Sequence, residues 1–341
     1  MSYDDGLITG LLLGSGGGSG GSDEPAYLND PDYALYMALP RPKRNQAIEL
    51  VRITEDNTGA SLNGSVNTRV SPWTDVHVTA DWGDGITTSG TYESVGDNRY
   101  KWVTEPHVYE KKGDYIITFT DESIDHGSTT FLASYSYSGT YPNISLRAYT
   151  VAIKIGEDFA YQQHLDTVRY ITLPSKFAEF YDDRILFNHG IYNSAYLLHV
   201  DYVAATKPTK LNYNAFGTLP YMDFTNIIPM LSDVEELGSG SLSRVYNLRG
   251  TLTLPKCKKL YNNFEYTGIQ KLILPECEEI SSSGNYNYSL EEINCPACTS
   301  VSNSFRYNPL LRDVTFSDNC TIDSSSFYSS SKFYNFPQKI T

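Results

Sequence analysis

The C-terminal half of the chain repeats a short apolar motif, and this repetition restricts the fold more than any other feature. Apolar residues stand at the first, fourth and sixth positions of each copy, and the copies are Val168-Ile171-Leu173, Leu197-Val200-Tyr202, Ile269-Leu272-Leu274, Leu290-Ile293-Cys295 and Leu311-Val314-Phe316. The last three copies follow one another at intervals of 21 residues. Because one such unit cannot bury its own apolar edge, we expect the copies to stack into a solenoid with a shared core.

Cysteines recur at one position of these repeats. Cys257, Cys277 and Cys298 each follow a proline by two residues, and a phenylalanine stands seven residues after Cys257, Cys298 and Cys320. A small apolar side chain packs well between stacked units, so this ladder predicts buried free thiols. All five cysteines lie beyond position 256 and an odd number cannot pair completely. Disulfides between adjacent repeats stay open, because the sequence does not give their geometry.

One pair of cysteines, Cys295 and Cys298, has the C-x-x-C spacing of redox sites and of half zinc sites. Cys298 already belongs to the ladder, Cys295 occupies the position of Leu274, and the sequence has no second pair with this spacing. We therefore expect both thiols to be structural and no metal to be bound.

The period and the apolar spacing are typical of leucine-rich repeats, whose units run about 20–29 residues. Residues 161–341 are similar to the irregular, BspA-type leucine-rich repeats of gut-bacterial surface proteins. Those units are a little longer and carry an Ala-Phe pair, which Ala215-Phe216 shows here and most later copies do not. The resemblance implies a leucine-rich-repeat domain used for adhesion or recognition rather than for chemistry.

Residues 46–122 read as short strands separated by turns. Ala47–Ile53, Val76–Trp82 and Tyr115–Phe119 have β-forming compositions, and Gly83-Asp84-Gly85 and Lys112-Gly113-Asp114 are turn signals. This spacing predicts an antiparallel β-sandwich. The fold class expected for the whole chain is therefore mainly β, a sandwich followed by an irregular solenoid.

Three motifs in this segment resemble the PKD family. They are Asp81-Trp82-Gly83-Asp84-Gly85, His107-Val108-Tyr109 and Gly113-Asp114-Tyr115-Ile116-Ile117-Thr118, with Ile117 where that family usually has valine. The resemblance implies an immunoglobulin-like sandwich that serves as a spacer or adhesion module. Its structural residues would be Trp82, Asp84, Gly85, His107, Tyr109, Gly113 and Tyr115.

The residues themselves support part of this interpretation. We expect Trp82 to fill the core and the Asp84 carboxylate to accept hydrogen bonds from turn amides. The alternative is a calcium site at Asp81 and Asp84, although two carboxylates fall short of the roughly six to eight oxygens that Ca²⁺ takes.

Residues 1–24 combine a Gly/Ser tract with a short apolar patch formed by Leu7, Ile8, Leu11, Leu12 and Leu13. The segment lacks both the basic start of a signal peptide and the about 20 apolar residues of a membrane span. We interpret the patch as an anchor inserted into a partner, the alternative being a disordered terminus. Residues 25–45 read as a linker and residues 123–160 as a transitional segment.

The first 14 residues and the glycine tract after them are similar to the N-termini of virion proteins from phages of gut Firmicutes. This resemblance implies that the N-terminus attaches an appendage to a phage particle.

The charge balance argues against nucleic acid as a partner. The chain has 26 Lys and Arg against 40 Asp and Glu, a formal net charge of −14, and no basic run that could release counterions from phosphates. Its 28 tyrosines lie in segments rich in Ser and Asn, a composition that suits recognition surfaces. We expect a glycan or protein ligand to contact an outward strip made of Tyr266, Tyr286, Tyr288, Tyr307 and Tyr328.

No group of residues predicts catalysis. The six histidines lack metal-ligand spacing. The adjacent carboxylates Glu235-Glu236 and Glu278-Glu279 would point to opposite faces of a strand, whereas a glycosidase pair flanks one bond across about 5–9 Å. We expect no enzyme activity, no catalytic residue, no cofactor and no metal.

These features together predict a non-catalytic phage virion appendage, such as a tail fibre or another adhesin, that binds host-surface or environmental ligands through its repeats. It would join other virion proteins through residues 1–24 and form a homo-oligomer on the virion surface. It would be made in the host cytoplasm without a signal peptide or membrane insertion. The alternatives are a capsid or tail decoration protein without host recognition, a bacterial cell-surface adhesin and a carbohydrate-active enzyme.

Overall fold

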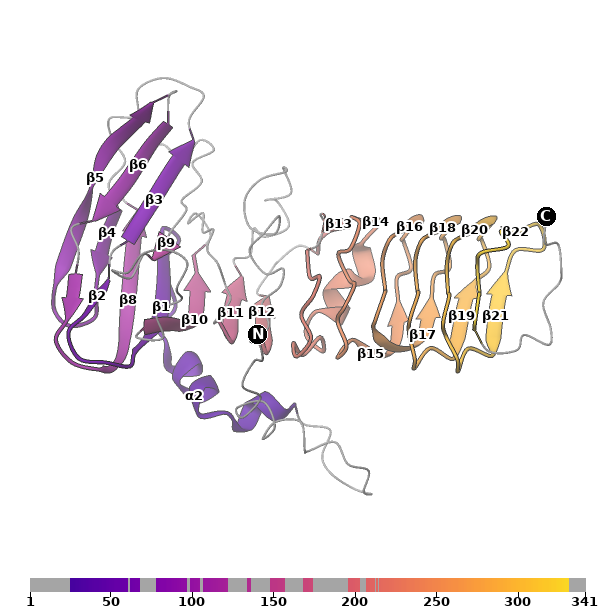
Figure 1. Ribbon diagram of the computed structural model, residues 1–341, viewed down its shortest axis with the longest axis horizontal. Coiled ribbons are helices and arrows are strands. Elements are labelled where there is room, and N and C mark those ends of the chain that lie inside the picture. Colours follow the sequence, from indigo (N-terminus) through magenta and orange to yellow (C-terminus); the bar gives the residue numbers. More distant parts are fainter. Residues whose placement is uncertain are drawn as a thin grey trace.

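A computed structural model describes residues 25–60, 62–67, 78–96, 99–104, 107–121, 134–135, 148–156, 168–173, 196–202, 207–211, 213 and 215–330. The predicted anchor at residues 1–24 lies outside these ranges. The chain is mainly β: a large sheet in the N-terminal part is followed by a β-solenoid in the C-terminal part (Figure 1).

The large sheet has ten strands in the order β12-β11-β10-β1-β8-β4-β5-β6-β3-β9. Their bounds are β1 Gln46–Ile53, β3 Leu62–Asn67, β4 Val78–Asp81, β5 Thr87–Gly96, β6 Arg99–Thr104, β8 Gly113–Asp121, β9 Ser134–Tyr135, β10 Ala148–Ile155, β11 Tyr170–Leu173 and β12 His199–Tyr202. A separate antiparallel pair joins β2 (Thr58–Ala60) to β7 (His107–Tyr109). The immunoglobulin-like arrangement of these strands stays a prediction.

The tryptophan motif forms a compact cluster beside this sheet. Trp82 is fully buried, its ring stacks on His107 with 4.9 Å between centroids, and its carbonyl accepts a hydrogen bond of 3.0 Å from the Tyr109 hydroxyl. Asp84 Oδ1 accepts a hydrogen bond of 3.2 Å from the Ile86 amide, and Asp84 Oδ2 lies 2.9 Å from His107 Nε2. Trp82 thus belongs to the buried apolar core, and Asp84 accepts a hydrogen bond within the turn that follows it.

Strand β10 connects the two parts of the molecule. It pairs antiparallel with β1 on one side and parallel with β11 on the other, and β11 continues in parallel to β12. β11 and β12 carry the first two copies of the apolar motif. The first two repeats therefore add their strands to the edge of the N-terminal sheet. This sheet covers an end of the solenoid that would otherwise be exposed.

Residues 25–45, which the sequence predicts to be a linker, include a 3-10 helix η2 (Ala26–Asn29) and a helix α2 (Pro31–Ala38). Asp30 caps α2 by accepting a 2.9 Å hydrogen bond from the Asp32 amide, and Pro31 stands at the first helical position. The buried Tyr36 of α2 belongs to an apolar cluster with residues of β1, β10 and β11. This apolar contact and the Asp-Pro start explain why the segment folds instead of remaining extended.

The solenoid consists of two parallel sheets. The six-stranded sheet contains β13 Lys210–Leu211, β14 Glu236–Leu237, β16 Lys259–Tyr261, β18 Glu279–Ser281, β20 Ser300–Ser302 and β22 Thr321–Ile322. The four-stranded sheet contains β15 Arg249–Thr253, β17 Gly268–Ile273, β19 Glu292–Cys295 and β21 Asp313–Phe316. A 3-10 helix η4 (Ile228–Asp233) precedes β14.

The apolar motif supplies the solenoid core, as the repetition predicts. Ile269, Leu272 and Ile293 are buried, and one continuous apolar cluster extends from β1 to the late repeats. Val314 and Phe316 of the last copy are only half-buried.

The cysteine ladder has the predicted form. Cys257, Cys277 and Cys298 are buried at one position of successive repeats, and each thiol lies 3.3–3.4 Å from the carbonyl oxygen two residues later. Cys295 is buried in β19, Cys320 is only half-buried, and all five cysteines are free. Among the described residues, no group of three or more His, Cys, Asp or Glu is placed to hold a metal ion.

Candidate binding groove

The corner of each repeat, the segment that leads from the six-stranded to the four-stranded sheet, has an unusual backbone. Tyr266, Tyr286 and Tyr307 have φ angles of +53°, +60° and +57°, a left-handed conformation that costs non-glycine residues roughly 1–2 kcal/mol. Two residues earlier in each corner, Phe264, Gly284 and Phe305 are also left-handed. The side chains of these equivalent tyrosines therefore leave the backbone in the same direction in three successive repeats.

A ladder of buried amides holds these corners in register. Asn287 Oδ1 accepts a hydrogen bond of 2.6 Å from the Thr267 amide, and Asn308 Oδ1 accepts one of 2.7 Å from the Asn287 amide. The side-chain nitrogen of Asn287 also donates to the Phe264 carbonyl at 2.6 Å. A buried polar group left unpaired costs about 1–3 kcal/mol, so this ladder opposes the strain of the left-handed residues.

The tyrosines of the corners form a stack. The rings of Tyr266 and Tyr286 are 4.8 Å apart and inclined by 1°, and those of Tyr286 and Tyr307 are 4.7 Å apart and inclined by 9°. Tyr328 meets Tyr307 edge to face, and the Arg306 guanidinium lies 5.6 Å from the Tyr307 ring centroid. Because stacked rings cover each other's faces, the inner tyrosines offer a ligand mainly their edges and hydroxyls.

An open pocket of about 520 Å³ lies beside the start of this stack. We call it the tyrosine groove; its nine lining residues are Tyr246, Arg249, Tyr266, Thr267, Gly268, Gln270, Tyr286, Tyr288 and Ser289. Tyr246 is 51% exposed and Tyr288 is 61% exposed. These two tyrosines therefore present large aromatic surfaces to solvent at the two sides of the groove.

The groove exists because one corner is a residue shorter than its neighbours. In each flanking repeat, two residues separate the last buried residue of the corner from the next core residue; these are Tyr246-Asn247 in one repeat and Tyr288-Ser289 in the other. In the repeat between them, Gly268 alone separates the two. A Cβ atom at Gly268 would lie 2.6 Å from the Tyr246 carbonyl oxygen and 2.8 Å from Arg249 Cγ. Only glycine allows this close approach, so the chain is recessed between the two exposed tyrosines.

The structure brings together the five tyrosines expected from the sequence, but in different settings. Tyr266 and Tyr286 line the groove from the stack, Tyr288 forms one side of it, and Tyr307 and Tyr328 continue the row beyond it. Sequence reasoning missed Tyr246 and Arg249, which precede the clearest repeats, and Gln270, which lies at a polar position inside one of them. The one available signal was the missing residue at Gly268 when the copies are aligned.

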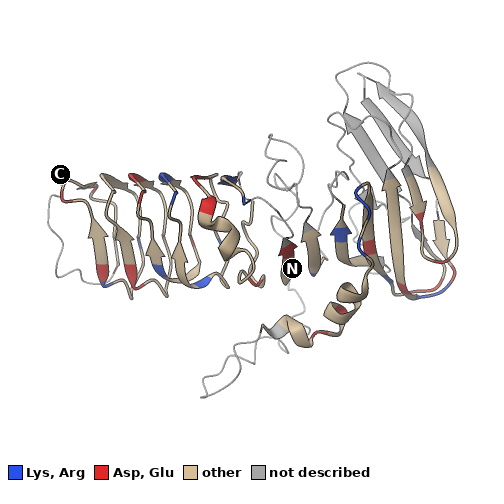
Figure 2. Cartoon of the chain, turned by 180° about the vertical axis from the view of Figure 1, so that it is seen from behind, with Lys and Arg blue, Asp and Glu red and all other residues tan. Residues whose placement is uncertain are grey.

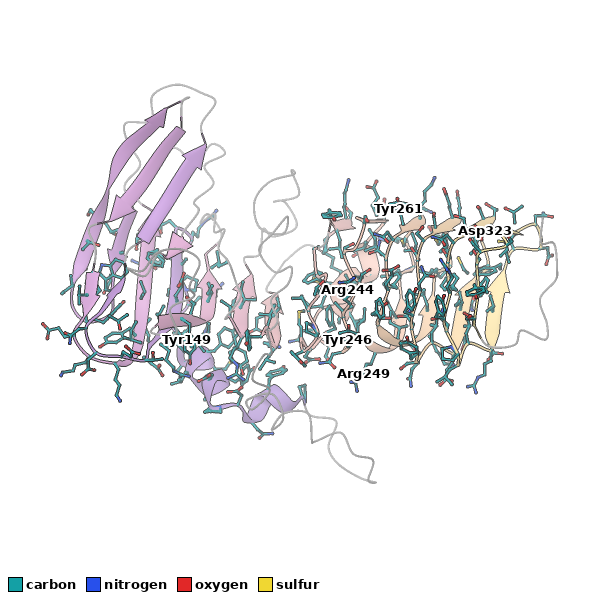
Figure 3. The ribbon with its side chains drawn as sticks, in the orientation of Figure 1. Tyr149, Arg244, Tyr246, Arg249, Tyr261 and Asp323 are labelled. Carbon is teal, nitrogen blue, oxygen red and sulfur yellow. The ribbon has the colours of Figure 1, made fainter. Side chains whose placement is uncertain are left out.

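Two arginines near the groove differ from the other cations of the solenoid. Lys256, Lys259 and Lys271 pair with carboxylates at 2.5, 2.9 and 2.7 Å, and Figure 2 shows residues of both charges along the repeats. Within the described part of the chain, Arg244 and Arg249 form no ion pair; Arg249 Nη2 donates to Asn247 Oδ1 at 3.3 Å. Figure 3 shows Tyr246 and Arg249 along the edge opposite Tyr261.

The adjacent carboxylates considered for catalysis lie on the exposed surface. Glu236 pairs with Lys210 at 3.0 Å and Glu279 with Lys259 at 2.9 Å, while Glu235 and Glu278 are exposed. Of the six histidines, His107 and His199 fall within the described residues, and each is buried beside an aspartate. Glu236 and Glu279 thus take part in ion pairs between successive repeats.

Neither a protein-family model, nor a curated protein, nor a solved structure matches this chain. The resemblances to PKD domains and to BspA-type repeats therefore stay predictions. No helix in the described ranges is long and apolar enough to cross a membrane.

Proposed function

We propose that this chain is a non-catalytic binding protein that holds its ligand, a host-surface or environmental glycan or protein, in the tyrosine groove. The observation that carries the proposal is the recessed corner at Gly268 between two exposed tyrosines, Tyr246 and Tyr288. Aromatic rings that are more than half exposed lose apolar contact with water when a ligand covers them. A concave site with aromatic sides and a few polar groups is the usual form of a binding pocket.

The rigidity of the corners supports this proposal. The amide ladder and the tyrosine stack fix the position of the groove before any ligand arrives. A ligand then loses less free energy to the ordering of protein side chains than it would on a mobile loop. In this proposal the repeats are an irregular leucine-rich-repeat domain, and the N-terminal sheet is an immunoglobulin-like, PKD-type spacer that caps them.

The proposal places the protein on the surface of a phage particle, as a homo-oligomeric appendage attached by residues 1–24. It is supported by the apolar residues Leu7, Ile8, Leu11, Leu12 and Leu13, which stand beside a Gly/Ser tract in the sequence. Deleting residues 1–24 should prevent the chain from joining virions and leave ligand binding intact. Virions that still incorporate the truncated chain would refute attachment through residues 1–24, whereas absence of the full chain from virions would favour a bacterial surface adhesin.

The binding role is tested by the adhesion of the full chain to host cells and to a glycan array. The double variant Tyr246→Ala/Tyr288→Ala should lose at least about tenfold in affinity, because aromatic anchors dominate binding energy. The matched control is Tyr213→Ala/Tyr261→Ala, whose tyrosines are 57% and 61% exposed and lie outside the groove. Equal binding by both variants would refute the groove, and no binding by the unaltered chain would favour a decoration protein.

A further inference from the structure

The tyrosine groove carries positive charge in a chain that is otherwise acidic. The chain has a formal net charge of −14, yet none of the nine residues lining the groove is acidic and one of them is Arg249. The nearest acidic residue of the corner, Glu265, accepts a hydrogen bond of 3.4 Å from Asn285. The groove is thus an exception to the charge of the whole molecule, and this suggests an anionic ligand.

The donor capacity of Arg249 supports the same conclusion. A guanidinium has five N–H donors, and Arg249 uses one of its nitrogens for a 3.3 Å hydrogen bond to Asn247. It forms no ion pair among the described residues, whereas lysines of neighbouring strands do. Arg244 and Glu265 act with opposite signs on Tyr266, so Arg249 alone supplies the positive charge of the groove. Such a guanidinium is suited to a carboxylate, which it can bind through two parallel hydrogen bonds.

The size of the groove points to a ring-shaped group. Tyr246 and Tyr288 belong to repeats two steps apart, which is about 10 Å at roughly 4.8 Å per strand. A ring in contact with both tyrosines needs roughly 7–8 Å, at about 3.5–4.0 Å for each pair of touching atoms. The groove therefore has room for one ring between the two tyrosines, with Arg249 and Gln270 able to reach its substituents.

We propose that the tyrosine groove binds a carboxylated sugar unit of an acidic polysaccharide, with Tyr246 and Tyr288 flanking the sugar ring and Arg249 pairing with its carboxylate. This inference rests on the proposed binding function and names its ligand class. A nucleic acid fits less well, because its phosphates would follow a surface on which most cations are already paired with carboxylates.

The test compares the binding of the full chain to acidic polysaccharides and to the same polymers after carboxyl reduction. The probes are polygalacturonate, alginate, hyaluronan and polysialic acid, each beside its neutral, reduced form. At least one acidic polymer should bind about tenfold or more tightly than its reduced form, because hydrogen bonds to charged groups are worth that much. The preference should weaken as salt concentration rises.

Variants separate this inference from the binding function itself. Arg249→Gln should abolish the preference for the acidic polymer and leave residual binding to its reduced form, and Arg249→Lys should restore part of the preference. The control Arg312→Gln removes the same charge from an exposed arginine of the last repeats, which is paired with Glu291, and should change nothing.

Four outcomes would overturn the proposal. Equal binding of acidic and reduced polymers would refute the charged ligand and leave the groove's binding role standing. An unchanged preference in Arg249→Gln would refute the role of this arginine. Tighter binding of a single-stranded oligothymidylate, or of an acidic peptide, would replace the polysaccharide with another class of ligand. Binding to none of the probes, while host cells are still bound, would also refute it.

Discussion

Gly284 and Gly250 have similar left-handed backbones, with φ angles of +70° and +76°, but differ in the space around them. A Cβ atom at Gly284 would lie 2.5 Å from the Phe305 ring, whereas at Gly250 it would meet nothing within 4 Å. Gly284 stands where neighbouring repeats have Phe264 and Phe305, so its missing side chain leaves room for the next ring. This position shows how one residue decides whether successive corners can stack.

The two glycines provide a matched pair for measuring the packing of the corners. Gly250→Ala should lower the free energy of unfolding by about 1–2 kcal/mol through backbone strain alone. Gly284→Ala should lower it by roughly 2–5 kcal/mol, because displacement of Phe305 adds to the same strain. Chemical denaturation of the two variants checks this. Equal losses would show that Phe305 does not depend on the space at Gly284.

At the scale of elements, helix α2 is held on the sheet by charge as well as by apolar contact. Burial disfavours the charge on Asp32, but hydrogen bonds and charge from Arg52 and Arg169 outweigh this, so the pKa of Asp32 lies below its ordinary value. Arg52 Nη2 lies 2.9 Å from Asp32 Oδ1, and Arg169 Nη1 lies 2.8 Å from Asp32 Oδ2. The ionised carboxylate thus connects α2 to β1 and to the residue that precedes β11.

This arrangement predicts a dependence on pH. Because folding lowers the pKa of Asp32, its contribution to stability is present above the unfolded value of about 3.9 and is lost as the pH falls through the folded pKa. The protection of the amides of residues 26–38 against hydrogen exchange, relative to the unfolded chain, should therefore fall below about pH 4, before that of the solenoid amides. Asp32→Asn should lower this protection already at neutral pH and cost about 1–2 kcal/mol, given partial solvent screening.

The exposed pair of Asp56 and Lys111, 3.7 Å apart, provides the control. Asp56→Asn should leave the exchange of residues 26–38 unchanged at every pH. If Asp32→Asn behaves like this control, the helix is held by apolar packing alone.

The sequence predicts some elements well and misses others for physical reasons. The apolar motif predicts the solenoid core and the cysteine ladder, because positions that are buried at a fixed interval must be filled by apolar residues at that interval. The sequence does not predict the junction at β10, since an apolar strand such as Ala148–Ile155 has the same composition whether its neighbours are parallel or antiparallel. The groove is visible in the sequence only as a shorter corner, because it arises from a residue that is missing beside Gly268 rather than from one that is present.

At the scale of the whole molecule, an antiparallel and a parallel part of one sheet meet at β10, and one apolar core continues from this sheet into the solenoid. The N-terminal sheet continues through β10 into β11 and β12, and the apolar cluster continues from β1 to Leu311. A repeat array gains stability from contacts between neighbours, so its end is its weakest place unless it is covered. This continuity makes the N-terminal part a support for the repeats that form the tyrosine groove.

The central claim is that ligands occupy the groove between Tyr246 and Tyr288, and oxidative footprinting tests it most directly. The full chain is exposed to hydroxyl radicals with and without a ligand found in the adhesion screen, and oxidation of each tyrosine is measured by mass spectrometry. We predict that the ligand protects Tyr246 and Tyr288 and leaves Tyr261, which is as exposed as Tyr288, unchanged. Protection of Tyr261 without protection of Tyr246 and Tyr288 would contradict the claim.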